Sequence, residues 1–92
     1  MSRKRNHLEI IRDVLLAIQI KGNQARPTHI LYKSNISSDM LKQYLEDLME
    51  KGFIVEEKDK KENKLFSLTT KGFNYIKDFE TIKGFMESYG LE

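Results

Sequence analysis

The side chains best suited to chemistry in this chain donate hydrogen bonds or carry positive charge. Lysine and arginine bind phosphate oxygens, serine and threonine bind phosphates or base edges, and lysine and glutamine can contact guanine and adenine. Residues of these types, with one histidine, recur in four groups, and we expect the groups to bind nucleic acid. They are Arg3, Lys4 and Arg5; Arg26, Thr28, His29 and Lys33; Ser38, Lys42 and Gln43; and Lys58, Lys60, Lys61 and Lys64.

The sequence has none of the residue patterns that indicate an enzyme. It contains no cysteine, which excludes a thiolate nucleophile and a thiolate metal site. His7 and His29 lack a partner at metal-ligand spacing, and neither a glycine-rich phosphate loop nor a serine at a strand-to-helix elbow occurs. The carboxylate pairs Glu46-Asp47 and Glu56-Glu57 are typical of a solvated surface. We therefore expect no catalytic activity, no metal and no cofactor.

Positive charge is concentrated in the first part of the chain. Residues 1–36 carry seven basic and two acidic side chains, a net charge of +5, whereas the remainder carries nine basic and twelve acidic ones, a net charge of −3. The total of +2 is a weak indicator of nucleic-acid binding, but this asymmetry is expected when one face meets phosphates. The alternative is a mixed, solvated surface.

Length and hydropathy indicate one small domain. A chain of 92 residues buries roughly 60–65% of its unfolded surface, so it gains stability from pairing. The N-terminus lacks the apolar run of a signal peptide, and no apolar stretch approaches the ~20 residues of a membrane span. We expect a cytoplasmic protein of the nucleoid, with no membrane association and no small-molecule ligand.

Hydrophobic periodicity predicts a first helix over residues 7–21. Asn6 and Glu9 form a capping-box pattern at its start. Apolar residues recur at three- and four-residue steps, which indicates a core stripe. This stripe consists of Leu8, Ile11, Leu15 and Ile18.

Two further helices and a tight turn follow. The second starts at Pro27-Thr28 and stops at Ser34-Asn35, and the third is capped by Ser37 or Ser38 and ends at Gly52. Asn35 accepts the left-handed conformation and can make the turn between them. In a helix-turn-helix, the first turns of the second helix of the motif enter the major groove.

A β-hairpin and a last helix complete the chain. Two short apolar strands, Phe53–Glu57 and Leu65–Leu68, flank a charged tip, and Thr69 caps a helix that starts near Thr70. This order is that of a winged helix-turn-helix. The predicted fold class is α+β, mostly α: three helices and a two-stranded wing with a flexible basic N-terminal arm in residues 1–72, and an extra C-terminal dimerisation helix in residues 73–92.

The last helix carries an apolar seam at coiled-coil spacing, with steps of three, four and three residues. We expect this seam to form the interface of a homodimer. The alternative is that the helix folds back onto its own domain. The seam consists of Phe79, Ile82, Met86 and Tyr89.

The third helix is acidic for a helix that reads DNA. Four carboxylates in residues 39–50 outnumber Lys42 and Lys51, so phosphates repel it unless only its N-terminal end enters the groove. We expect a homodimer that binds double-stranded DNA as a transcriptional regulator or nucleoid-associated protein. The alternative is a winged-helix adaptor for protein–protein interaction with little or no DNA affinity.

Four segments resemble a known family. They are LEIIRDVLLAI, PTHILYKSNIS, LKQYLEDLMEKGFI and LTTKG, and the resemblance covers about residues 6–90. The chain is similar to the small archaeal winged-helix family of predicted transcriptional regulators, which includes chromatin-associated DNA-binding dimers joined by an antiparallel coiled coil of their last helices. The resemblance implies a homodimer, with DNA contacts from the second and third helices and with the seam of the last helix at the dimer interface.

Overall fold

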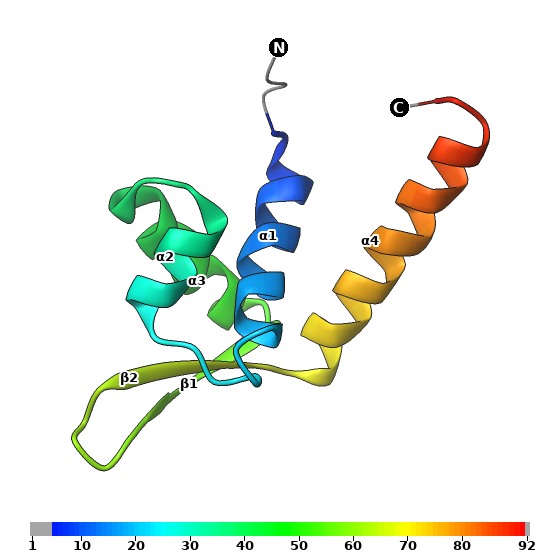
Figure 1. Cartoon of the computed structure of the whole chain (residues 1–92). Helices are drawn as coiled ribbons and strands as arrows, with labels where there is room; N and C mark the ends of the chain where they lie inside the picture. Colours follow the sequence, from blue (N-terminus) through cyan, green and yellow to red (C-terminus); the bar gives the residue numbers. More distant parts are fainter. Residues whose placement is uncertain (1–4, 92) are drawn as a thin grey trace.

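The computed structural model describes residues 5–91 as a mostly helical α+β domain (Figure 1). Helix α1 stands at the centre, with α2 and α3 on one side and α4 on the other, and a two-stranded antiparallel hairpin extends beneath the helices (Figure 1). The elements are α1 (His7–Gln19), α2 (Pro27–Ser34), α3 (Ser38–Glu50), β1 (Ile54–Lys58), β2 (Lys64–Leu68) and α4 (Thr70–Ser88). The predicted fold class, α+β and mostly α with three helices, a two-stranded hairpin and a further C-terminal helix, is confirmed. That last helix begins at Thr70, and its role in dimerisation stays a prediction.

Short polar side chains determine where three of the helices begin. Asn6 accepts a hydrogen bond from the backbone N–H of Glu9 (2.8 Å), and Glu9 accepts one from the backbone N–H of Asn6 (3.1 Å), which completes the predicted capping box. The hydroxyls of Ser37 and Thr69 accept from backbone amides in the first turns of α3 and α4. Each such cap stabilises its helix by ~1 kcal/mol.

A left-handed asparagine makes the turn between α2 and α3, as predicted. Asn35 has φ 54° and ψ 51°, a conformation that asparagine adopts more readily than most residues. Its backbone N–H donates to the carbonyl of Leu31 (3.2 Å) and ends α2. Ile36 then packs against the core, which holds the start of α3 in place.

The hairpin extends one residue further toward its tip than predicted. Lys58 pairs with Lys64 at the end of the ladder, so both lysines belong to strands. The prediction had placed them in the tip and had started β1 at Phe53, because the apolar pattern of the sequence stops before the backbone hydrogen bonds do. The observed tip is residues 59–63.

One hydrophobic core lies where α1 meets the other elements. Its largest fully buried side chains include Leu15, Ile18, Ile30, Leu48 and Ile54. Burying each of them contributes roughly 1.5–3 kcal/mol. Each helix and each strand supplies part of this core, and α4 does so through Ile76 in its first half.

Helix α4 packs on α1 through its first half. Ile76 is buried in the core, and the hydroxyl of Tyr75 donates to the carbonyl of Leu8 (2.7 Å). The two helices then diverge toward the N-terminal end of α1 (Figure 1). The prediction of a buried Leu8 is wrong, since this divergence leaves its side chain 55% exposed.

Arg12 joins α1 to the middle of α4. Its guanidinium lies over the ring of Phe79, and it pairs with Glu80 (3.0 Å). From Glu80 to Leu91 every residue is exposed. Along residues 5–91, no helix is long and apolar enough to cross a membrane.

Candidate nucleic-acid interface

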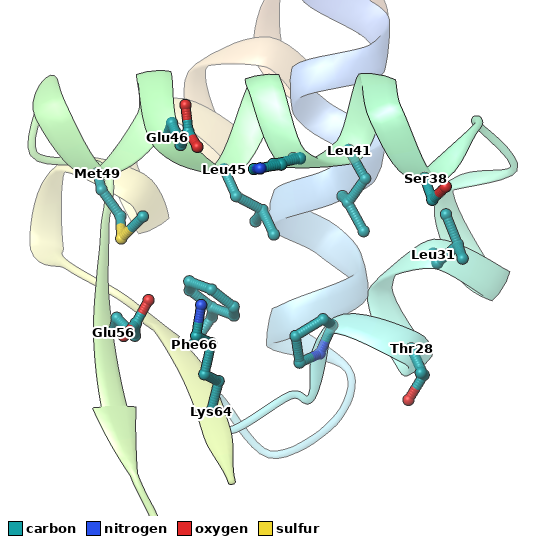
Figure 2. A pocket seen from close by; sticks show the side chains of 12 residues that line it. Thr28, Leu31, Ser38, Leu41, Leu45, Glu46, Met49, Glu56, Lys64 and Phe66 are labelled. Carbon is teal, nitrogen blue, oxygen red and sulfur yellow. The ribbon is translucent and has the colours of Figure 1, made fainter.

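A groove of about 530 Å³ opens between α2, α3 and the hairpin (Figure 2). Its apolar residues are buried or half-buried and form the floor, and its polar residues are exposed and form the rim. Figure 2 shows Leu41 and Leu45 pointing from α3 into this groove and Phe66 rising from β2 toward them. The floor is Pro27, Leu31, Leu41, Leu45, Met49 and Phe66, and the rim is Thr28, Ser38, Lys42, Glu46, Glu56 and Lys64.

Backbone hydrogen bonds hold the walls of the groove together. Ala25 and Phe66 exchange two of them (3.0 and 2.9 Å), which joins the loop before α2 to β2. The N–H of Phe53 donates to the carbonyl of Leu48 (2.9 Å), which joins the end of α3 to the start of the hairpin. The shape of the groove therefore depends on the main chain more than on its exposed side chains.

Four of the side chains predicted to bind nucleic acid meet at this groove. Thr28, Ser38, Lys42 and Lys64 come from three different elements, and all four stand on the rim. Gln43 is exposed on α3 but lies outside the groove. Among the described residues, no group of three or more His, Cys, Asp or Glu side chains could hold a metal ion.

Residues 4–87 of the sequence match the winged helix-turn-helix family. The chain belongs to this family. The hairpin is accordingly the wing, α2 and α3 form the helix-turn-helix, and α3 stands at the position of the recognition helix in this motif. The family predicted from the sequence segments is confirmed. A comparison with curated proteins finds no match.

Solved structures of other proteins share the fold. Sso10a-2, a DNA-binding protein from Sulfolobus solfataricus, superposes with a TM-score of 0.74 and 22% identity, over 94% of this chain and 90% of its own. MepR, a transcription regulator of the Staphylococcus aureus multidrug efflux pump MepA, gives 0.77 and 20%, over 87% of this chain and 60% of its own. A mutant of MepR bound to an oligodeoxyribonucleotide gives 0.73 and 23%, over 91% and 61%. Identities this low establish the fold alone.

Asp59 organises the tip of the wing. Its Oδ1 accepts hydrogen bonds from the backbone N–H groups of Lys61 (2.8 Å) and Asn63 (2.9 Å), and its Oδ2 accepts a weaker one from Arg26 (3.4 Å). The backbone hydrogen bond from Asn63 is the main cause that lowers the pKa of Asp59 below its ordinary value of 3.8. Arg26, a predicted phosphate ligand, is thus exposed but has a carboxylate partner.

The other predicted residues of α2 and the wing differ in exposure. Those that are exposed are Lys33, Lys58, Lys60 and Lys61. His29 is half-buried, and its Nε2 atom is shielded from solvent with no hydrogen-bond partner within residues 5–91. In this conformation protein atoms cover Nε2.

Arg5 is bound to the helices, whereas the sequence pattern indicated a flexible arm. Its Nη1 donates to Asp13 (2.7 Å) and to the carbonyl of Ser34 (2.6 Å), and its Nη2 donates to the carbonyl of Asn35 (2.8 Å). These bonds satisfy carbonyls at the end of α2 that lack helical partners. Arg3 and Lys4 lie outside the described residues.

The acidic side chains of the recognition helix occupy different surroundings. Asp39 lies in the first turn, where the helix dipole favours negative charge. Asp47 pairs with Lys51 (3.0 Å). Glu50 is exposed near the C-terminal end, and Glu46 stands on the rim of the groove. Of the four carboxylates on α3, only that of Glu46 lines the groove.

The second half of α4 exposes a row of large apolar side chains. Phe85, which the sequence prediction missed, follows Ile82 by three residues, and its ring lies 4.9 Å from that of Tyr89. Phe79 is half-buried beneath Arg12, so the chain's own fold covers part of the predicted seam. We refer to the exposed row as the α4 seam: Ile82, Phe85, Met86, Tyr89 and Leu91.

Proposed function

We propose that this winged-helix protein binds double-stranded DNA as a homodimer and acts as a transcriptional regulator or nucleoid component. The observation that carries the proposal is the convergence of Thr28, Ser38, Lys42 and Lys64 on one groove from three separate elements. Ser38 and Lys42 lie in the first two turns of α3, and it is the N-terminal part of a recognition helix that contacts base edges in the major groove.

Phosphate contacts would surround this groove. Lys33 and the lysines of the wing are exposed and free to meet the DNA backbone. Arg26 is held only by a 3.4 Å contact between two solvent-accessible groups. Exposed ion pairs contribute about 0–1 kcal/mol, so a phosphate would compete readily with Asp59 for the guanidinium. The amides at the start of α2 would add a further attraction for an anion.

Structural relatives support DNA as the ligand. Sso10a-2 is a DNA-binding protein, F93 from STIV is a winged-helix DNA-binding protein, and a mutant of MepR was solved bound to an oligodeoxyribonucleotide. The chain covers 90% of the length of each of the first two. Nearly the whole of each of these two structures is therefore the fold that this chain shares.

Self-association would come from the α4 seam. Its spacing of three and four residues places Ile82, Phe85 and Tyr89 along one side of the helix, and all three are more than half exposed. Burying an apolar side chain of this size contributes roughly 1.5–3 kcal/mol before the entropy of association is subtracted. A second copy of α4 offers a matching apolar surface, and pairing would present two recognition helices to one duplex.

Binding of a fluorescent random duplex, followed by anisotropy at increasing salt, tests the proposal. The logarithm of the binding constant should fall linearly with the logarithm of the salt concentration, with a slope of about −0.9 for each phosphate contacted. The rival function is a protein-interaction adaptor, which the four carboxylates of α3 favour. No binding at the lowest salt would reject DNA as the ligand and leave the adaptor.

A further inference from the structure

Glu46 belongs to a row of side chains that runs along the recognition helix. Ser38, Lys42 and Glu46 are spaced four residues apart, and residues at this spacing lie above one another on a helix. All three are exposed and all three line the groove. The row therefore presents a hydroxyl, an ammonium and a carboxylate in succession along the same side of α3.

Neither the ammonium of Lys42 nor the carboxylate of Glu46 has a partner among the residues that the structure describes. Lys42 and Glu46 are one helical turn apart, yet among residues 5–91 neither forms an ion pair or a side-chain hydrogen bond. On the same helix, Asp47 and Lys51 have the same spacing and are joined at 3.0 Å. The row thus leaves both its cation and its carboxylate available to another molecule.

We infer that Glu46 is a specificity-determining residue that accepts a hydrogen bond from the amino group of a cytosine in the major groove. This inference rests on the proposed function. Glutamate is the acceptor that suits cytosine N4, while a lysine suits the O6 and N7 atoms of guanine. The four-residue step advances the helix by about 6 Å, and stacked bases are about 3.4 Å apart. Glu46 then reads a base about two steps from the guanine contacted by Lys42.

A carboxylate at this place acts chiefly by rejecting thymine and guanine. Thymine O4 and guanine O6 are acceptors, so either would leave Glu46 unpaired opposite a partial negative charge. An unpaired charge in a desolvated interface is unfavourable, and such a penalty is a common means of discrimination. The acidity of α3, unfavourable for affinity, becomes a source of sequence preference at this position.

Selection of bound duplexes from a randomised pool tests the inference with three proteins: the parent, Glu46→Gln and Glu50→Gln. Both variants remove one negative charge from α3, but Glu50 lies outside the groove. The parent should prefer cytosine at one position by about tenfold. Glu46→Gln should change that preference to adenine, because glutamine pairs with adenine N6 and N7. Glu50→Gln should keep cytosine.

The outcomes separate this inference from the proposed function. A Glu46→Gln variant that binds DNA with the parent's base preference would overturn the role of Glu46 and leave DNA binding intact. A parent that binds DNA with no base preference would overturn it as well. Absence of binding by all three proteins would instead overturn the proposed function. Because Glu46 is exposed, the thermal unfolding of the variant should match that of the parent.

Discussion

The guanidinium of Arg12 in α1 lies over the ring of Phe79 in α4, with its central carbon 4.9 Å from the ring centroid. The same guanidinium pairs with Asp13 and with Glu80. Every residue from Glu80 to Leu91 is exposed, so the cluster lies where α4 leaves the domain. A residue expected at the dimer interface, Phe79, thus also anchors the helix that carries the interface.

Replacing Arg12 with alanine should lower the free energy of unfolding by about 1–2 kcal/mol, because the cation–π contact and the hydrogen bonds to Asp13 and Glu80 are lost. Urea unfolding measures this change. The matched control is Lys83→Ala, an exposed cation on the same α4 helix, which should change stability by less than about 0.5 kcal/mol. Equal losses in both variants would contradict the anchoring role of Arg12.

Gly72 is required by the close approach of α4 to the chain before β1. A Cβ atom at this position would lie 2.4 Å from the carbonyl oxygen of Phe53, whereas one at Gly84 in the same helix would have no atom within 4 Å. Gly72→Ala should therefore destabilise the fold by about 1–3 kcal/mol. Gly84→Ala should stabilise it by up to about 1 kcal/mol. Thermal unfolding of the two variants gives the comparison. A Gly72→Ala variant as stable as the parent would contradict the close packing of α4 against Phe53.

Local signals in the sequence were sufficient for the helix starts and the turn. Asn6, Ser37, Thr69 and Asn35 act on the backbone within a few residues, so their roles can be predicted without the tertiary structure. Burial of Leu8 could not be predicted, because it depends on the angle at which α4 leaves α1. The bonds of Arg5 to the end of α2 join residues about thirty positions apart, and no sequence pattern indicates them.

For the groove, too, the sequence predicts the types of the side chains but not the tertiary contacts that bring them together. The individual side chains Thr28, Lys42 and Lys64 could be chosen by type, since each suits DNA. Their convergence requires the pairing of Ala25 with Phe66, which brings β2 beside the start of α2. The exposure of Phe85 could have been predicted, because it lies three residues after Ile82 on the same side of the helix.

The α4 seam should determine the oligomeric state. The double variant Ile82→Asp, Phe85→Asp should sediment with half the mass of the parent, because two buried charges would oppose pairing. Val55→Asp places a charge on an exposed apolar residue of the wing and should leave the mass unchanged. Sedimentation equilibrium reports all three. A parent that sediments as a single chain would contradict the dimer.

The ionised carboxylate of Asp59 should make a pH-dependent contribution to the stability of the fold. Its pKa is lowered in the folded chain, chiefly by the backbone hydrogen bond from Asn63. A carboxyl with a lowered pKa stabilises the fold above its unfolded pKa, about 3.8, and the contribution is lost as the pH falls through the folded pKa. Asp59→Asn should therefore be less stable than the parent near neutral pH and show a flatter decline in acid. Glu56→Gln, at an exposed carboxylate of β1, is the control, and an identical acid profile for Asp59→Asn and the parent would refute this assignment.

The most direct test of the DNA-binding groove compares two pairs of lysines. Lys42→Ala, Lys64→Ala removes two positive charges from the rim of the groove, and Lys77→Ala, Lys83→Ala removes two from exposed positions on α4. Both variants have the same net charge, so any difference in their affinity for DNA is due to the positions of the lost charges. In the anisotropy titration with duplex DNA, we expect the groove variant to bind at least about tenfold more weakly, with a shallower salt dependence, and the α4 variant to bind nearly as the parent does. Equal affinities for the two variants would contradict the groove as the site of DNA binding.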